Sequence, residues 1–118
     1  MGLMRSLTWL FDFSKRRRIA EAAAAIAQAS QNLVWQRVSA RSATMRASEA
    51  RGYIRARAAQ VIWSQVDLYL AHQRALGADS RGELIELATT ETLHMVVRQW
   101  VQTRPGVVPA HVATRRAA

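Results

Sequence analysis

Apolar side chains dominate the first thirteen residues. When segment 1–13 is drawn as a helix, Arg5, Thr8 and Asp12 share one narrow wedge. Most of the remaining surface is apolar and carries Leu3, Met4, Leu7, Trp9, Leu10, Phe11 and Phe13. This pattern predicts a short amphipathic helix.

Ser14 is placed to cap a second helix, which would begin with four cations, Lys15, Arg16, Arg17 and Arg18. Cations at the N-terminus of a helix oppose its macrodipole. We therefore expect this cluster to serve a partner or to lie in solvent.

A second pattern runs from residue 15 to residue 76, where the chain has no proline and only one glycine, Gly52. Apolar or small side chains recur here at every seventh position: Ile19, Ile26, Leu33, Ala40, Ala47, Ile54, Val61 and Leu68. A sustained seven-residue repeat is typical of helices that pair along a seam. We predict one long helix over 15–76 whose seam forms a homo-oligomer or binds a partner helix. Ordinary amphipathic packing in an alanine-rich bundle is the alternative.

Two islands in this segment, 33–38 and 61–70, are apolar around most of the helix, which indicates burial on several sides. Gly52 lies nearly midway between them, and a turn there would stack one island on the other. We favour the continuous helix, because the seven-residue spacing continues without a shift on both sides of Gly52 and no new N-cap residue follows this glycine. A bend or turn near Gly52 stays open.

The chain breaks clearly after the long segment. Gly77 is suited to end a helix, and Ser80 and Glu83 have the spacing of a capping box ahead of an apolar run. We predict a last helix over 80–103, ended by Pro105. The chain then divides into an attachment segment 1–14, a helical oligomerisation domain 15–103 and a flexible basic tail 104–118.

Composition agrees with an all-α fold. The 118 residues include 22 alanines, five glycines and two prolines, a balance that favours helices over sandwiches and barrels. The absence of cysteine excludes disulfide scaffolds, thiol enzymes and iron–sulfur clusters. No stretch approaches the ~18 continuous apolar residues of a membrane span. We expect a cytoplasmic protein.

The formal net charge is +9, and the excess is concentrated in residues 15–57, which carry ten basic and two acidic side chains. The cations at the centre of the chain are candidates for binding an anionic partner: Arg37, Arg41, Arg46, Arg51 and Arg55. Non-specific nucleic-acid binding requires only such charge. The simpler interpretation is that these arginines lie on a helix face that is exposed to solvent and binds no partner.

Catalytic motifs are missing from the sequence. We find no phosphate-binding loop, dinucleotide fingerprint or nucleophile elbow, and we expect no enzyme activity, no cofactor and no small-molecule substrate. Glu91 and His94 have the Glu-x-x-His spacing of carboxylate-bridged metal bundles, but a solvated or hydrogen-bonded histidine is the favoured interpretation.

Together these patterns predict a non-enzymatic, self-associating helical scaffold or adaptor. Its N-terminal helix and Lys15–Arg18 would attach it to a larger protein assembly or to an anionic membrane surface at the cytoplasmic face. The first alternative is a nucleic-acid-associated protein that uses stretch 37–57. A dimeric metal-binding bundle at Glu91 and His94 is the more distant one.

Overall fold

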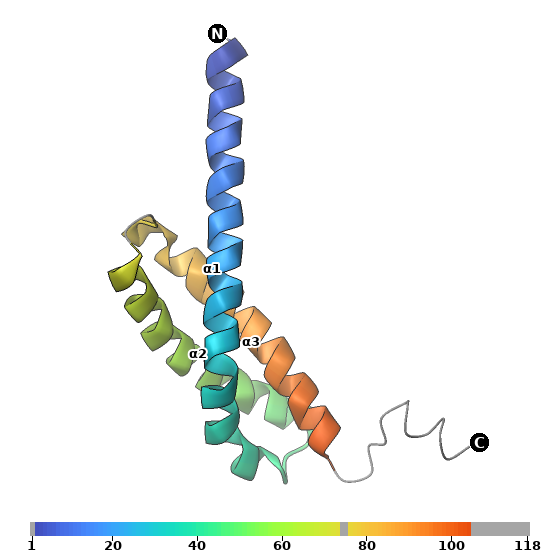
Figure 1. The fold of residues 1–118 in the computed structure, drawn as a ribbon. Coiled ribbons are helices and arrows are strands. Elements are labelled where there is room, and N and C mark those ends of the chain that lie inside the picture. Colours follow the sequence, from blue (N-terminus) through green and yellow to red (C-terminus); the bar gives the residue numbers. More distant parts are fainter. Residues whose placement is uncertain (1, 74–75, 105–118) are drawn as a thin grey trace, which may run out of the picture.

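The computed structural model describes residues 2–73 and 76–104, with side chains from residue 9 onward, and its regular structure is entirely helical. The elements are α1 (Gly2–Ser42), α2 (Ala47–His72), the short 3-10 helix η1 (Ala78–Ser80) and α3 (Arg81–Thr103). In Figure 1, α2 runs back along α1, and α3 then runs in the direction of α1. The all-α fold and the last helix are confirmed. Residues 105–118 of the predicted tail lie outside the described residues.

The two helices expected on either side of Ser14 form one continuous helix, so the predicted cap at Ser14 is wrong. Strong helix formers such as leucine, arginine and alanine surround this residue, and no proline or glycine favours a break. Lys15–Arg18 therefore lie inside α1, well beyond its first turn. Because the helix dipole acts mainly within the terminal turn, it does not disfavour these cations.

The long helix predicted over 15–76 is instead interrupted at residues 43–46, and Gly52 lies inside α2. The carbonyl oxygen of Ser42 accepts a hydrogen bond of 3.1 Å from the Met45 backbone N–H and one of 2.9 Å from Trp100 Nε1. Arg46 is extended at φ −72° and ψ 161°. The chain thus forms a hairpin, but it turns where a tryptophan of α3 holds the end of α1.

The predicted capping box at Ser80 and Glu83 is also wrong. Ser80 makes no side-chain cap hydrogen bond, and its buried hydroxyl has no partner. Its backbone is at φ −85° and ψ −7°, whereas a capping serine is extended. The reason is that η1 continues directly into α3. The preceding helix ends at His72 rather than near Gly77, and the Gln73 N–H bonds to the Tyr69 carbonyl at 2.9 Å.

Buried side chains recur at every fourth position on all three helices. The positions are 22, 26, 30, 34, 38 and 42 on α1, 50, 54, 58, 62 and 66 on α2, and 84, 88, 92, 96 and 100 on α3. Four residues turn an α-helix by about 400°, so a stripe with this spacing rotates about 40° per step. Helices with such stripes cross at an angle, whereas a seven-residue seam follows a partner helix lengthwise.

The eight positions of the predicted seam do not share one face of the molecule. Four are buried in the core of this single chain: Ile19, Ile26, Ile54 and Val61. The other four are exposed: Leu33, Ala40, Ala47 and Leu68. The seven-residue pattern therefore does not describe how these helices pack, and self-association stays a prediction.

The core consists of two clusters along the bundle. One joins Ile19, Ala22, Ala23 and Ile26 of α1 to Ile62 and Val66 of α2 and Leu84 and Ala88 of α3. The other joins Val34 and Val38 to Ile54, Ala58 and Val61, with Leu93, Val96 and Trp100 from α3. Both predicted islands are thus covered on one side within the chain, although Trp63 stays half exposed.

Candidate attachment site

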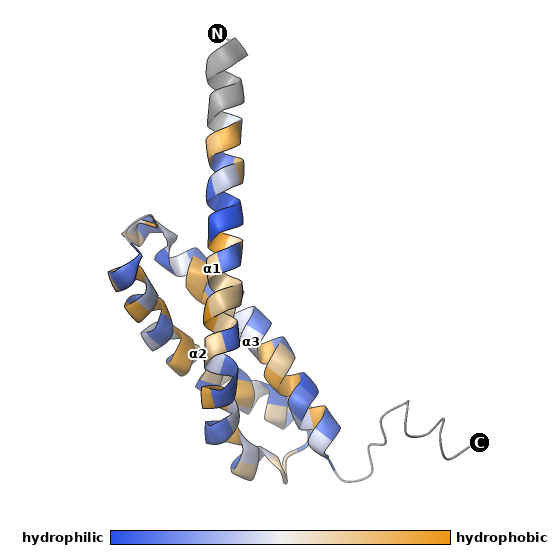
Figure 2. Cartoon of the chain, viewed as in Figure 1, coloured by the Kyte–Doolittle hydropathy of each residue, from blue (hydrophilic) through white to orange (hydrophobic). Residues whose placement is uncertain are grey.

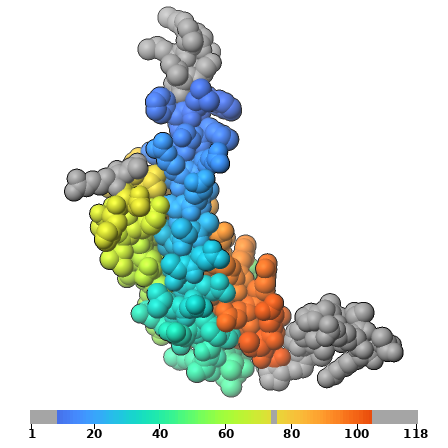
Figure 3. Space-filling view, viewed as in Figure 1, coloured from blue at the N-terminus to red at the C-terminus, as the bar shows by residue number. Residues whose placement is uncertain are grey.

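The N-terminal part of α1 projects beyond the rest of the bundle (Figures 1 and 3). Ile19 is the first buried residue of the described side chains, and residues 9–18 before it are exposed except for the half-buried Ser14. Helical propensity, together with the continuation of α1 into the bundle from Ile19 onward, keeps this segment helical. It therefore presents its side chains to the surroundings in fixed directions.

Four large apolar side chains crowd the outer part of this projection. Trp9, Leu10, Phe11 and Phe13 are 65%, 53%, 74% and 56% exposed, and we call them the apolar tip. The rings of Trp9 and Phe13 stack with their centroids 5.8 Å apart. The side chains of Leu3 and Leu7, which the sequence assigned to the same surface, lie outside the described ones. Soluble proteins rarely leave such a patch exposed without a use for it.

Four cations follow directly and form what we call the basic collar: Lys15, Arg16, Arg17 and Arg18. Successive helix residues are about 100° apart, so four in a row point in four directions around the axis. In Figure 2 an apolar band near the N-terminal end of α1 is followed by a strongly hydrophilic one. The site is a helix with an apolar end and a ring of positive charge behind it.

Two of the collar cations have partners within the chain. Lys15 Nζ donates to Asp79 Oδ2 at 2.7 Å, and this ion pair raises the pKa of Lys15 and lowers the pKa of Asp79. Arg17 Nε lies 3.2 Å from Glu21 Oε1, one turn further along α1. For Arg16 and Arg18 the described residues supply no ion pair. These two guanidinium groups are therefore available to an external anion.

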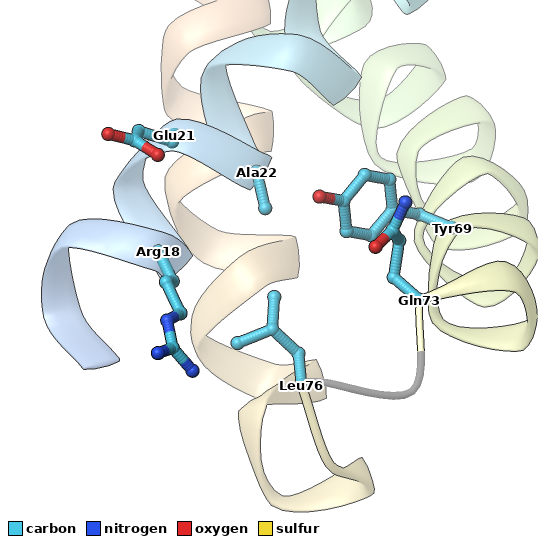
Figure 4. A pocket seen from close by; sticks show the side chains of 6 residues that line it. All are labelled: Arg18, Glu21, Ala22, Tyr69, Gln73 and Leu76. Atoms are coloured by element: carbon cyan, nitrogen blue, oxygen red, sulfur yellow. The ribbon is translucent and has the colours of Figure 1, made fainter. Parts of the chain in front are cut away.

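Arg18 also borders a hollow of about 200 Å³ between α1 and the end of α2. Figure 4 shows Tyr69 and Gln73 reaching toward α1 and Leu76 pointing into the same space. Glu21, which pairs with Arg17, lines this hollow as well, so the hollow carries charges of both signs. We therefore assign the hollow no ligand of its own and regard it as the place where the projection meets the bundle.

The arginines of stretch 37–57 do not form one surface. Arg41 and Arg57 place their guanidinium carbons 5.6 and 5.5 Å from the ring centroid of Tyr53, within cation–π range. The Tyr53 hydroxyl donates to the carbonyl oxygen of Arg37 at 3.4 Å. Sequence reasoning missed this cluster, although an aromatic residue among arginines was a visible signal for it.

The remaining cations of the stretch point elsewhere. Arg51 and Arg55 line a groove between α2 and α3, and Arg46 lies exposed at the turn before α2. Binding along a duplex would require a continuous row of cations that contact phosphates, and these arginines do not form such a row. Nucleic-acid binding through Arg37, Arg41, Arg46, Arg51 and Arg55 stays a prediction from charge alone.

Glu91 and His94 line one hollow together with Glu86, on the side of α3 that faces α1. Within the part of the chain that the structure describes, however, no group of three or more histidine, cysteine, aspartate or glutamate side chains could hold a metal ion. The metal-binding alternative therefore gains no support from the arrangement of these residues.

No protein-family model, curated protein or solved structure matches this chain. Among the described residues, no helix combines the length and the apolar character that crossing a membrane requires. The function of the chain has to be inferred from its own residues.

Proposed function

We propose that this chain is a non-enzymatic helical adaptor that attaches to an anionic membrane surface through its apolar tip and basic collar. The observation that carries the proposal is the exposure of Trp9, Leu10, Phe11 and Phe13 on a projecting helix, directly ahead of four cations. The three-helix bundle would then stand on the water side of the surface, free to meet other molecules.

The apolar tip supplies the hydrophobic part of the attachment. Complete burial of one large apolar side chain contributes about 1.5 to 3 kcal/mol, so four that are more than half exposed can contribute about 3 kcal/mol or more. Tryptophan is also suited to the boundary between headgroups and acyl chains, because its ring is amphipathic. The described side chains of the tip therefore fit a shallow insertion.

The basic collar supplies the electrostatic part. Each cation close to an anionic leaflet can add about 1 kcal/mol, and the effect declines within a Debye length. Because the collar surrounds α1, some of its cations face the membrane whichever way the helix rotates. Charge complementarity thus favours an anionic lipid surface, such as a cytoplasmic leaflet, over a neutral one. A protein partner would need an apolar groove with an acidic rim.

Vesicle flotation with the full chain tests the proposal. We expect binding to vesicles of phosphatidylcholine with phosphatidylserine and little binding to phosphatidylcholine alone. The variant Leu10→Ser/Phe11→Ser/Phe13→Ser should lose binding, because it removes most of the apolar tip. A blue shift of tryptophan fluorescence on binding should be smaller in Trp9→Phe.

A matched control changes three exposed apolar residues outside the projection, Leu33→Ser/Leu68→Ser/Val101→Ser. We expect this control to bind as the unchanged chain does. Equal loss of binding in both triple variants, or no binding of the unchanged chain to anionic vesicles, would show that the apolar tip is not a membrane site. A protein that co-purifies with the unchanged chain and not with the tip variant would indicate protein docking instead.

A further inference from the structure

A groove of about 450 Å³ lies between the first half of α2 and the middle of α3. Its polar lining comes from both helices and consists of Ser48, Arg51, Arg55, Thr89, Thr90 and His94. The residues from the two helices stand about forty positions apart in the sequence, and the return of α3 along α2 brings them together. The groove belongs to the size class of small-molecule sites.

The charge of the groove is not compensated from within it. Arg51 and Arg55 are one turn apart on α2, where like charges repel, and none of the lining residues is acidic. The described residues form ion pairs for Lys15, Arg17 and Arg81 but not for Arg51 or Arg55. An anion in the groove would relieve this repulsion.

The groove is also lined by two threonine side chains, Thr89 and Thr90. The side-chain oxygen of Thr89 is buried and makes no hydrogen bond in the structure. By contrast, Thr90 Oγ1 donates to the Glu86 carbonyl oxygen at 3.0 Å and is satisfied. A buried polar atom without a partner is uncommon and calls for an explanation. Because this oxygen is closed to solvent as the side chain stands, a ligand in the groove would bond to it only after the Thr89 side chain rotates.

Gly52 lines the groove between Arg51 and Arg55. A Cβ atom built at this position meets nothing within 4 Å, so the space beside it is empty rather than filled by the protein. Glycine inside a helix costs about 1 kcal/mol relative to alanine. The residue is therefore unfavourable for α2 itself, and its small size leaves room between Arg51 and Arg55.

We propose that this groove binds the phosphate group of a small soluble molecule. Two guanidinium groups and neighbouring hydroxyl and imidazole groups match the several acceptor oxygens and the double negative charge of a phosphomonoester. The arrangement favours a small molecule over nucleic acid, since Arg41 and Arg57 are held on Tyr53 and do not extend the site into a track.

A soluble phosphate is favoured over a lipid headgroup because of the position of the groove. Figure 1 places the start of α2 at the end of the bundle remote from the projecting end of α1. A membrane held at the apolar tip would therefore lie away from Arg51 and Arg55. The site is independent of the proposed attachment, and each can fail without the other.

Titration of the full chain with inorganic phosphate, at ionic strength matched with sodium chloride, tests the site. We expect saturable binding in calorimetry and a saturable shift of the His94 ring resonances, identified with His94→Gln. Arg51→Gln/Arg55→Gln should weaken binding by about tenfold or more, because charge-assisted hydrogen bonds are lost. Gly52→Leu should abolish it by filling the groove, and leucine is the better helix former at that position.

The matched control is Gly82→Leu, since Gly82 also lies in a helix with nothing within 4 Å of a built Cβ. We expect it to bind phosphate normally. Unchanged phosphate binding in Gly52→Leu, with helix content preserved by circular dichroism, would overturn the proposal. The proposal would also be overturned if sodium chloride alone produced the same calorimetric and resonance changes as phosphate.

Two further arms separate the possible sources of the phosphate. Vesicles with phosphatidic acid should bind equally to the unchanged chain and to Gly52→Leu. If free phosphate does not bind and Gly52→Leu binds these vesicles more weakly, the soluble ligand is excluded in favour of a lipid headgroup. Binding of a duplex oligonucleotide that Arg51→Gln/Arg55→Gln weakens, without binding of free phosphate, would instead assign the groove to nucleic acid.

Discussion

The ion pair between Lys15 and Asp79 ties the base of the projecting helix to η1. It joins residues 64 positions apart, and both side chains are largely exposed. Exposed pairs contribute little to stability, so this contact adds only weakly to the packing that holds α1 against the rest of the bundle. The hydrogen bond from Lys15 is the largest cause of the lowered pKa of Asp79.

The pH dependence of this contact has a defined sign. A carboxyl group whose pKa is lower in the folded state stabilises that state above its unfolded pKa of about 4, and the effect is lost as the pH falls through the folded value. Lys15, with a raised pKa, contributes below its unfolded value of about 10.4 and stops contributing as the pH rises through the folded one. The pair is thus complete across neutral pH.

We therefore predict that Asp79→Asn lowers the thermal midpoint slightly and equally from about pH 5 to pH 9. As the pH falls below about 4 and then through the lower folded pKa of Asp79, the difference from the unchanged chain should shrink toward zero, because Asp79 then becomes protonated in the folded state as well. Thermal melts followed by circular dichroism at a series of pH values provide the measurement. A difference that persists at low pH would mean that the ion pair is not its cause.

At the scale of the helices, the four-residue spacing of buried positions determines how the bundle packs. Many of the buried positions are alanine, serine or threonine, such as Ala22, Ser30 and Thr92. Small side chains let helices approach closely where their ridges cross. The same residue types also occur on the surface, as at Ala40 and Ala47, so sequence alone does not distinguish the two roles.

Ile54 and Leu68 distinguish the two packing patterns, because both belong to the seven-residue pattern and only Ile54 is buried. We predict that Ile54→Ala lowers the free energy of unfolding by about 2 to 5 kcal/mol, since it leaves a cavity in the core. Leu68→Ala should change it by roughly 0.5 kcal/mol or less. Urea denaturation measures both. Similar losses in the two variants would instead support a seam in which both positions are buried.

For the whole molecule, the important feature is the separation of two cationic surfaces. The basic collar lies at the base of the projection, whereas Arg51 and Arg55 line a groove toward the other end of the bundle. Net charge alone would draw any anion to either place. The exposed apolar tip adjoins the collar, whereas hydroxyl and imidazole side chains adjoin Arg51 and Arg55. These neighbours are the reason why we propose a membrane as the partner of one surface and a small phosphate as the ligand of the other.

We predict that Arg16→Gln/Arg18→Gln weakens binding to anionic vesicles by about tenfold or more, since each cation adds about 1 kcal/mol there. The control Arg46→Gln/Arg98→Gln removes the same charge from exposed positions outside the collar and should have a smaller effect. In the flotation assay, increasing salt should weaken the binding of the unchanged chain more than that of the collar variant. Equal effects of both double variants would mean that net charge, rather than the collar, determines binding.

Much of this protein can be predicted from residues that are close together in the chain. Helical propensity and the near absence of proline and glycine specify helices, and the apolar tip and basic collar are adjacent segments of one of them. Side chains within a few residues on a helix have fixed relative directions. For this reason the sequence predicts the all-α class, the last helix and the composition of the attachment surface.

What the sequence did not determine depends on contacts between residues far apart. At the hairpin over 43–46 the Ser42 carbonyl accepts from Met45 within the turn and from Trp100, 58 positions after Ser42, and no proline or glycine marks the turn in the sequence. The groove likewise needs α3 to place Thr89 and His94 opposite Arg51 and Arg55. Local propensity decides that residues are helical, but the energy of long-range packing and hydrogen bonding decides where helices end and which faces meet.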